Sequence, residues 1–210
     1  MRRWVCLDVG ECLIDETRVW STWASVLGVP GFTLSAVLGG LIERGGDHTE
    51  AFALLGRPGW ADFTEAFEAA YGGFRHEDLY PDALPALARL RASGRRVAVI
   101  GNQPARRHAE LLALGVDVDV MAMSESMNAH KPDPAFFARA LELMGSPPPC
   151  TTVYVGDRLD NDVLPALAAG MGAVWLRRGP WGLLQRREPG APPVPEVRGL
   201  MEVCDLVAPP

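Results

Sequence analysis

Lysine is almost absent from this chain. Lys131 is the single lysine among the 20 basic residues, and the other 19 are arginines. The planar guanidinium of arginine cannot reproduce a compact ammonium group on a flexible stem. Any role that needs a lysine therefore falls to Lys131, and its retention favours a functional position over a chance survivor on the surface.

Paired cysteines and long apolar runs are also missing. The four cysteines show no Cys-x-x-Cys spacing and lie in or beside apolar segments, so no zinc site is evident and reduced thiols are expected. Asp8 interrupts the apolar N-terminal stretch too early for a signal peptide, and no later segment approaches the length of a membrane span. We therefore expect a cytoplasmic protein without a membrane partner.

The negative charge is concentrated in one segment. The formal net charge is −6, and residues 15–80 hold ten acids against four arginines, which accounts for the whole excess. No basic stripe of the kind that binds nucleic acid occurs, so a nucleic-acid partner is not expected. The acidic segment would oppose an anionic ligand unless its charges face outward.

The first apolar run is followed directly by a carboxylate. Residues 4–7 have the composition of a buried strand in a parallel sheet, and Asp8 follows directly. Ligands bind beyond the carboxyl ends of such strands, which makes Asp8 a candidate reactive group. Taken by itself, however, an aspartate here is also explained as a turn former or a helix cap.

Residues 16–79 have the spacing of several short helices. Gly28 and Pro30 end the first of them, and Thr33 is placed to cap the second. Aromatic residues recur at helical intervals, which indicates a core more readily than a cofactor site. We expect a helical insertion that packs around its own aromatic residues.

From residue 80 onward, strands and helices alternate. Strands are expected around 96–100, 116–122, 151–155 and 173–176, with helices over 82–93, 104–114, 134–144 and 161–169. This alternation predicts an α/β, Rossmann-like parallel sheet with helices on both faces. The predicted domains are residues 1–15 and 80–210 as the core and residues 16–79 as the insert, with 177–210 forming a loop plus a short terminal element.

Polar residues follow each expected strand. The first strand ends at Asp8, the second at Gly101-Asn102 and the fourth at Gly156-Asp157, while Lys131 lies in the loop after the third. Parallel strands direct their carboxyl ends to one edge, so these groups should converge. Taken alone, Asp157 is also explained as a turn residue and Asp160 or Asn161 as a helix cap. Three carboxylates meeting at this edge, however, would repel one another unless a cation lay between them, and oxygen ligands suit Mg²⁺.

With these residues in place, the whole chain resembles the haloacid dehalogenase superfamily. The resemblance rests on the aspartate loop, the helical insert behind it, Lys131-Pro132-Asp133-Pro134, and the run Gly156-Asp157-Arg158-Leu159-Asp160-Asn161-Asp162. It implies a hydrolase with an α/β core and a cap formed by the insert, which closes over the sheet edge.

The resemblance also implies roles at matching positions. Asp8 matches the nucleophile that forms an aspartyl-phosphate, and Lys131 matches the lysine that steadies nucleophile and phosphate. Asp8, Asp157 and Asp162 match the Mg²⁺ ligands, with the backbone carbonyl of Gly10 as a further ligand.

The position after the second strand is implied to bind phosphate. Gly101 and Asn102 occupy it, and Asn102 joins Asp8 and Lys131 as a predicted catalytic residue. The amides at the helix start near Pro104 are further candidates to cradle an anion.

Two positions depart from the family pattern. Phosphatases of the family carry an aspartate two residues after the nucleophile as general acid and base, and Gly10 stands there instead. Its loss would cost on the order of 10²–10⁴ in rate, and Glu11 is a candidate replacement. Gly101 likewise replaces the expected serine or threonine, which removes one hydroxyl contact to phosphate.

The leading hypothesis is a Mg²⁺-dependent phosphatase of a small phosphorylated metabolite, as a monomer or homodimer. A family member that binds a ligand or a partner protein without turnover is the alternative, because of Gly10, Gly101 and the acidic insert. A 2-haloacid dehalogenase is a weaker third option, since the chain lacks the tyrosine and serine usual in those enzymes. Phosphonate cleavage through a cap lysine is excluded, because residues 16–79 contain no lysine.

Overall fold

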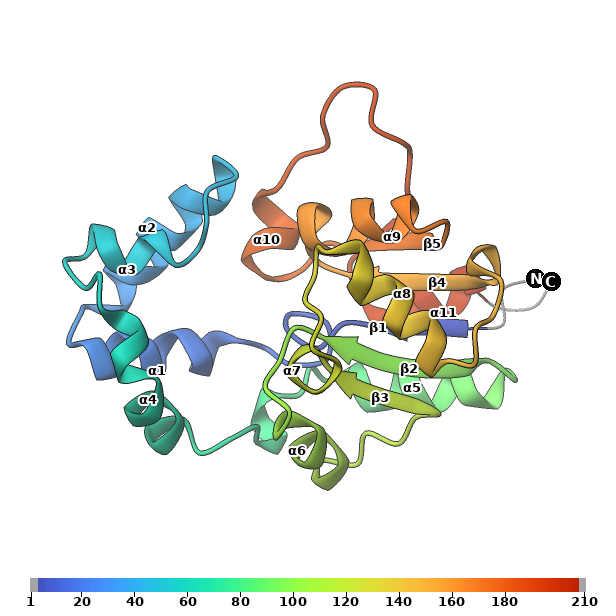
Figure 1. The fold of residues 1–210 in the computed structure, drawn as a ribbon, viewed down its shortest axis with the longest axis horizontal. Helices are drawn as coiled ribbons and strands as arrows, with labels where there is room; N and C mark the ends of the chain where they lie inside the picture. The colour runs from blue at the N-terminus through green and yellow to red at the C-terminus, as the bar shows by residue number, and fades with distance from the viewer. Residues whose placement is uncertain (1–3, 208–210) are drawn as a thin grey trace.

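Six parallel strands form the centre of the protein (Figure 1). The computed structural model describes residues 4–207, and the strand order is β3-β2-β1-β4-β5-β6. The strands are β1 Trp4–Leu7, β2 Arg96–Gly101, β3 Val120–Met123, β4 Thr152–Gly156, β5 Gly172–Leu176 and β6 Glu196–Val197. Every neighbouring pair is parallel, so β1 in the middle ends at the same edge as its neighbours.

Side chains of β1 alternate between two hydrophobic layers. Val5 and Leu7 belong to the layer under one face of the sheet, whereas Trp4 and Cys6 belong to the layer under the other. This is the two-residue period of a strand that is buried on both faces. The unbroken apolar run in the sequence follows from this burial.

Helices cover both faces of the sheet. The layer of Val5 and Leu7 includes residues of α5 (Ala83–Ala92), α6 (Arg107–Ala113) and α11 (Leu200–Val207). The opposite layer includes residues of α8 (Pro134–Leu143) and α9 (Leu164–Ala168). The short helix α7 (Ser124–Met127) follows β3 directly. The predicted Rossmann-like α/β fold is thereby confirmed.

The helical insert after β1 stands beyond the sheet edge as a cap (Figure 1). Its helices are α1 Thr17–Leu27, α2 Gly31–Glu43, α3 Glu50–Leu54 and α4 Thr64–Tyr71, the last preceded by a 3₁₀ turn at Trp60–Phe63. Trp23 of α1 stacks on Phe67 of α4 with ring centroids 4.2 Å apart, and Phe52 packs at 5.4 Å from Trp23. The expected aromatic core of the insert is present.

The C-terminal segment is more ordered than the sequence predicted. Residues expected to be mostly loop form α10 (Gly179–Leu184) and β6 before α11. Trp181 of α10 packs against Leu38 and Ile42 of α2, so this segment joins the core to the cap. Its proline and glycine content hid the helix, because Pro180 occupies the first turn, where a proline costs no hydrogen bond.

Two other local predictions were wrong. Thr33 lies inside α2, because Pro30 in extended conformation is the residue at the helix cap. The helix expected from Asn161 is instead a π-helical turn at Leu159–Val163 followed by α9. Such widened turns accommodate functional side chains, and this one contains Asp162.

The division into domains at residues 15/16 and 79/80 stays a prediction.

Within residues 4–207, no single helix is long and apolar enough to span a membrane. The pair α1 and α2, bent by 118°, together meets the length and composition criterion for a span.

Candidate active site

Lys131 lies between two carboxylates at the carboxyl edge of the sheet. Its Nζ is 2.7 Å from Oδ1 of Asp8, which follows β1, and 2.6 Å from Oδ1 of Asp162, which follows β4. All three side chains are buried. Burial alone would lower the pKa of Lys131, but the carboxylates of Asp162 and Asp8 outweigh it and raise that pKa. The predicted convergence of distant strand ends is therefore present.

Asp157 completes a cluster of three acids with Asp8 and Asp162. Each of the three offers a carboxylate oxygen within 4.8 Å of the other two. Burial raises the pKa of Asp8 to about 6 against the opposing charge of Lys131. Burial also raises the pKa of Asp157, and the neighbouring charges of Asp162 and Asp8 add to it. Three acids face one lysine, so the cluster resists full ionisation without a further cation.

The cluster fits a divalent cation. The buried Oδ2 of Asp157 has no hydrogen-bond partner among residues 4–207. Carboxylate oxygens suit Mg²⁺ as ligands, and this unpartnered oxygen is available to bind the ion. Gly10 lines the same cavity, and a contact from its carbonyl to the ion stays a prediction.

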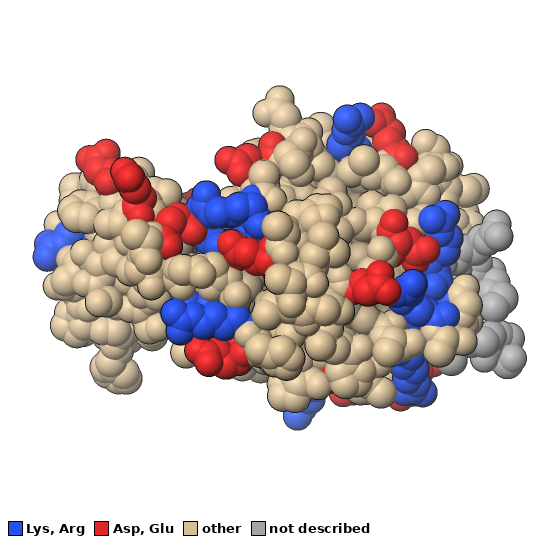
Figure 2. Space-filling model, turned by 90° about the horizontal axis from the view of Figure 1, so that it is seen from below, with Lys and Arg blue, Asp and Glu red and all other residues tan. Residues whose placement is uncertain are grey.

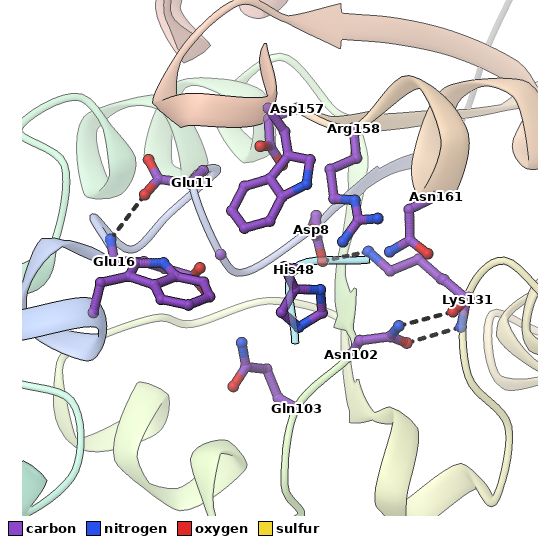
Figure 3. Close-up of a pocket in the computed structure, with 13 residues that line it drawn as sticks. Asp8, Glu11, Glu16, His48, Asn102, Gln103, Lys131, Asp157, Arg158 and Asn161 are labelled. Atoms are coloured by element: carbon purple, nitrogen blue, oxygen red, sulfur yellow. Dashed lines mark hydrogen bonds and ion pairs between the residues drawn. The ribbon is translucent and has the colours of Figure 1, made fainter. Parts of the chain in front are cut away.

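Asn102 holds the backbone of Lys131 in place (Figure 3). Its Nδ2 donates to the Lys131 carbonyl at 3.0 Å, and its Oδ1 accepts from the Lys131 amide at 2.8 Å. The side-chain amide thus has a structural partner on both sides, while Asn102 still lines the cavity.

The amides near Pro104 do not form the predicted anion cradle. The amide of Gln103 donates to Ser124 Oγ at 3.1 Å, and that of Ala105 donates to Glu125 Oε2 at 2.6 Å. The helix also starts later, because α6 begins at Arg107. These two donors are satisfied within the protein.

Gly101 leaves room for the carboxylate of Asp8. A Cβ atom at Gly101 would lie 2.5 Å from Asp8 Oδ1 and 3.0 Å from Cγ2 of Val9. The absence of a serine or threonine here is therefore matched to the position of Asp8 in this structure.

Glu11, the predicted replacement for the acid that Gly10 lacks, lines the cavity, but its carboxylate is engaged by other groups. It has a positive φ of 48°, and its carboxylate accepts from the Tyr80 hydroxyl and, at 3.1 Å, from the amide of Glu16. Figure 3 shows the Glu11 carboxylate directed away from Asp8. An offset of one residue from Gly10 can turn a side chain away, and here the left-handed backbone at Glu11 does so.

Glu16 occupies the space beside Gly10. A Cβ atom at Gly10 would lie 2.3 Å from Oε1 of Glu16 and 2.9 Å from its Cδ. Glu16 precedes α1 and lines the same cavity as Asp8. Glu16 was not predicted as a site residue, since no motif separates it from the other acids of the insert.

The cap covers a small polar cavity next to Asp8 and Asp157. The cavity has a volume of about 220 Å³, and Trp20, His48 and Trp181 line it together with Arg158. His48 and Trp181 pack edge to face with ring centroids 5.9 Å apart, and the Arg158 guanidinium lies 5.1 Å from the Trp181 ring. These four residues were also missed, because they come from the cap, the turn after β4 and α10.

Most acids of the insert point elsewhere. Basic and acidic side chains lie side by side where the cap meets the core in Figure 2. Glu68 of α4 pairs with Arg106 and Arg107 of the core, and Asp78 pairs with Arg18. Within the described chain, Glu16 is the one acid of residues 16–79 that lines the cavity. Among the acids of the insert, Glu16 is therefore the one placed to repel an anion bound in the cavity.

Known proteins resemble the chain in sequence and in fold. The family described as haloacid dehalogenase-like hydrolase matches residues 5–170. A glyceraldehyde 3-phosphate phosphatase of Methanopyrus kandleri is 33% identical over 174 residues, which cover 79% of this chain and 74% of that protein. A phosphoserine phosphatase of Thermus thermophilus is 34% identical over 142 residues, which cover 66% of this chain and 55% of that protein.

Among solved structures, the magnesium-bound HAD-hydrolase YfnB of Bacillus subtilis superposes with a TM-score of 0.76 over 98% of both chains. At 18% identity, this likeness shows the shared fold. The family match includes the aspartate loop, the insert and the cluster of Asp8, Asp157 and Asp162. The chain belongs to the haloacid dehalogenase-like hydrolases.

Proposed function

We propose that this protein is a Mg²⁺-dependent phosphatase that hydrolyses a small phosphorylated metabolite through an aspartyl-phosphate on Asp8. The observation that carries the proposal is the setting of Asp8. Its carboxylate pairs with Lys131 at 2.7 Å, belongs to the cluster with Asp157 and Asp162, and faces the cavity.

Asp8 is the group suited to attack phosphorus. Lys131 keeps the carboxylate in place and offers a positive charge to the oxygens of an incoming phosphoryl group. Asn102 fixes the backbone of Lys131 through two hydrogen bonds, and the ion pairs with Asp8 and Asp162 hold its ammonium group. Nucleophile and cation are therefore prearranged before the substrate binds.

Asp8, Asp157 and Asp162 are the residues that would hold the metal ion. Bound Mg²⁺ neutralises charge on the transferring phosphoryl group. The unpartnered Oδ2 of Asp157 and the presence of three acids around one lysine support this assignment.

The cavity favours a small substrate. About 220 Å³ accommodates a phosphoryl group with a short organic part, and Trp20, His48 and Trp181 limit further extension. Arg158 adds a cation at the wall of the cavity. The relatives named for glyceraldehyde 3-phosphate and phosphoserine act on molecules of this class. We expect the cap to move aside for entry and to exclude water on closing.

The alternative is a protein that binds Mg²⁺ and phosphate without turnover. Gly10 favours it, since this position offers no side chain for proton transfer. Calorimetry with Mg²⁺ and inorganic phosphate, alongside a turnover assay, separates the two: binding without product formation supports the alternative.

The test is phosphate release from a panel of aryl phosphates, acyl phosphates and small phosphorylated sugars and acids. We expect Mg²⁺-dependent release that Asp8→Asn abolishes. Asp117→Asn is the matched control, because Asp117 is exposed and pairs with Arg91 before β3, at the opposite end of the sheet. No release over the whole panel, or unchanged release in Asp8→Asn, contradicts the proposal. Halide release from a short 2-haloacid without metal would point to a dehalogenase instead.

A further inference from the structure

The space beside Gly10 is filled by a carboxyl group from another part of the chain. Oε1 of Glu16 lies 2.3 Å from the position of a Cβ atom at Gly10, so the first atom of any side chain there would collide with it. An added side chain at position 10 would therefore displace the end of the Glu16 side chain from this space. The carboxyl group of Glu16 thus occupies the place where a side chain at position 10 would present its own carboxyl group.

Hydrogen bonds of the main chain fix the position of Glu16 beside Gly10. Its amide donates to Glu11 Oε1 at 3.1 Å, and its carbonyl accepts from the Trp20 amide at 3.1 Å at the start of α1. Glu11 is held in turn by Tyr80. These bonds fix the main chain and direct the Glu16 side chain to the cavity that Asp8 also lines.

We propose that Glu16 is the catalytic acid and base of this protein, in place of the side chain that Gly10 lacks. The inference rests on the proposed phosphatase function. It goes beyond the match of residues to the family, because the group comes from the segment that leads into the cap.

The proton transfers balance in two steps. Asp8 attacks phosphorus, the bond from phosphorus to the leaving oxygen breaks, and that oxygen takes the proton of the Glu16 carboxyl group. Water then attacks the aspartyl-phosphate and gives its proton to the Glu16 carboxylate, while the bonding pair returns to Asp8. Inorganic phosphate leaves and Glu16 is protonated again.

Other groups near Asp8 are less suited. Glu11 is engaged by Tyr80 and by the backbone of Glu16. His48 lines the cavity from the cap, packed against Trp20 and Trp181. It is the competing candidate, and the experiment includes it.

The first experiment compares leaving groups. Phosphoryl transfer from phenyl phosphate needs a proton for its leaving oxygen, whereas transfer from dinitrophenyl phosphate does not. We expect Glu16→Gln to lower the rate of the first turnover on phenyl phosphate by about 10²–10⁴ and on dinitrophenyl phosphate by less than about tenfold. Glu65→Gln, an exposed glutamate of α4, is the matched control.

The second experiment exchanges the two positions. Gly10→Asp alone should lose activity, because its side chain meets Glu16, and Gly10→Asp with Glu16→Ala should recover to within about tenfold of the wild-type rate. Thermal unfolding and Mg²⁺ titration of each variant confirm that it is folded. An equal loss on both leaving groups in Glu16→Gln, or a leaving-group effect in His48→Gln instead, overturns the inference. In either case the loss of activity in Asp8→Asn would still support the proposed function.

Discussion

The side-chain amide of Asn102 bonds to both the N–H and the C=O of Lys131, at 2.8 and 3.0 Å. Two loops that follow different strands are joined by this pair, and the cation of the site depends on it for its position. Asn102 acts on the site through Lys131, in addition to any contact with the substrate.

Replacing Asn102 by alanine should loosen Lys131. We expect the free energy of unfolding to fall by about 1–3 kcal/mol, since buried polar groups of the Lys131 backbone lose their partners. Asn102→Asp retains the acceptor for the Lys131 amide but loses the donor to its carbonyl, and both variants should show reduced kcat. Urea unfolding and steady-state kinetics measure the two effects. Wild-type stability in Asn102→Ala would show that water replaces the amide without loss.

Lys131 neutralises charge on two buried carboxylates, so its replacement should lower the free energy of unfolding. Lys131→Met leaves Asp8 and Asp162 without their cation, and we expect metal-free protein to lose about 3–5 kcal/mol of unfolding free energy. Added Mg²⁺ should restore part of this loss. Chemical denaturation with and without Mg²⁺ measures it, and Arg139→Met, at an exposed pair with Glu142, is the control. Equal effects of the two substitutions would argue against the assigned charge balance.

A side chain at position 101 should displace the carboxylate of Asp8. Although serine or threonine is usual at this position in the family, a Cβ atom here would lie 2.5 Å from Asp8 Oδ1. We expect both Gly101→Ala and Gly101→Ser to lower kcat by about tenfold or more, because the nucleophile must move. Kinetics of the two variants check this. A gain of activity in Gly101→Ser would mean that the hydroxyl contact to phosphate outweighs the displacement of Asp8.

Metal-free protein should lose stability as the pH rises. Burial raises the pKa of Glu16 to about 8, with Glu11 adding to it, and burial raises that of Asp8 to about 6. A folded-state pKa above the unfolded value means that the folded protein binds more protons, so stability falls between about pH 4 and about pH 8. Thermal unfolding in chelator measures this slope. Glu16→Gln should flatten its upper part, and Mg²⁺ should reduce its lower part; a slope of opposite sign contradicts both shifts.

The elements that hold the site were predictable because parallel strands obey a simple rule. Asp8 and Asp157 directly follow strands, and Lys131 lies in the loop beyond β3 and α7. The common direction of the strands places them at one edge. Local sequence predicts where each strand begins and ends, and the alternation of strands with helices predicts that the strands are parallel and end at the same edge of the sheet. No side-chain orientation was needed to reach that conclusion.

The direction of individual side chains was not predictable. Glu11 lies next to Gly10 in the sequence, but its positive φ turns it to Tyr80, and Glu16, six residues from Gly10, fills the space instead. Trp181 reaches the cavity because α10 packs on α2, a contact between distant segments that no local pattern encodes.

Phosphorylation of Asp8 itself is the event that the proposed function requires. Protein mixed with Mg²⁺ and an aryl phosphate, quenched in acid and digested, can be examined by mass spectrometry for a phosphoryl group on the peptide that contains Asp8. We expect one phosphoryl group there in the wild type, more of it in Glu16→Gln with dinitrophenyl phosphate, and none in Asp8→Asn. Phosphate release without any phosphorylated Asp8 peptide, or the same modification in Asp8→Asn, would contradict an aspartyl-phosphate on Asp8.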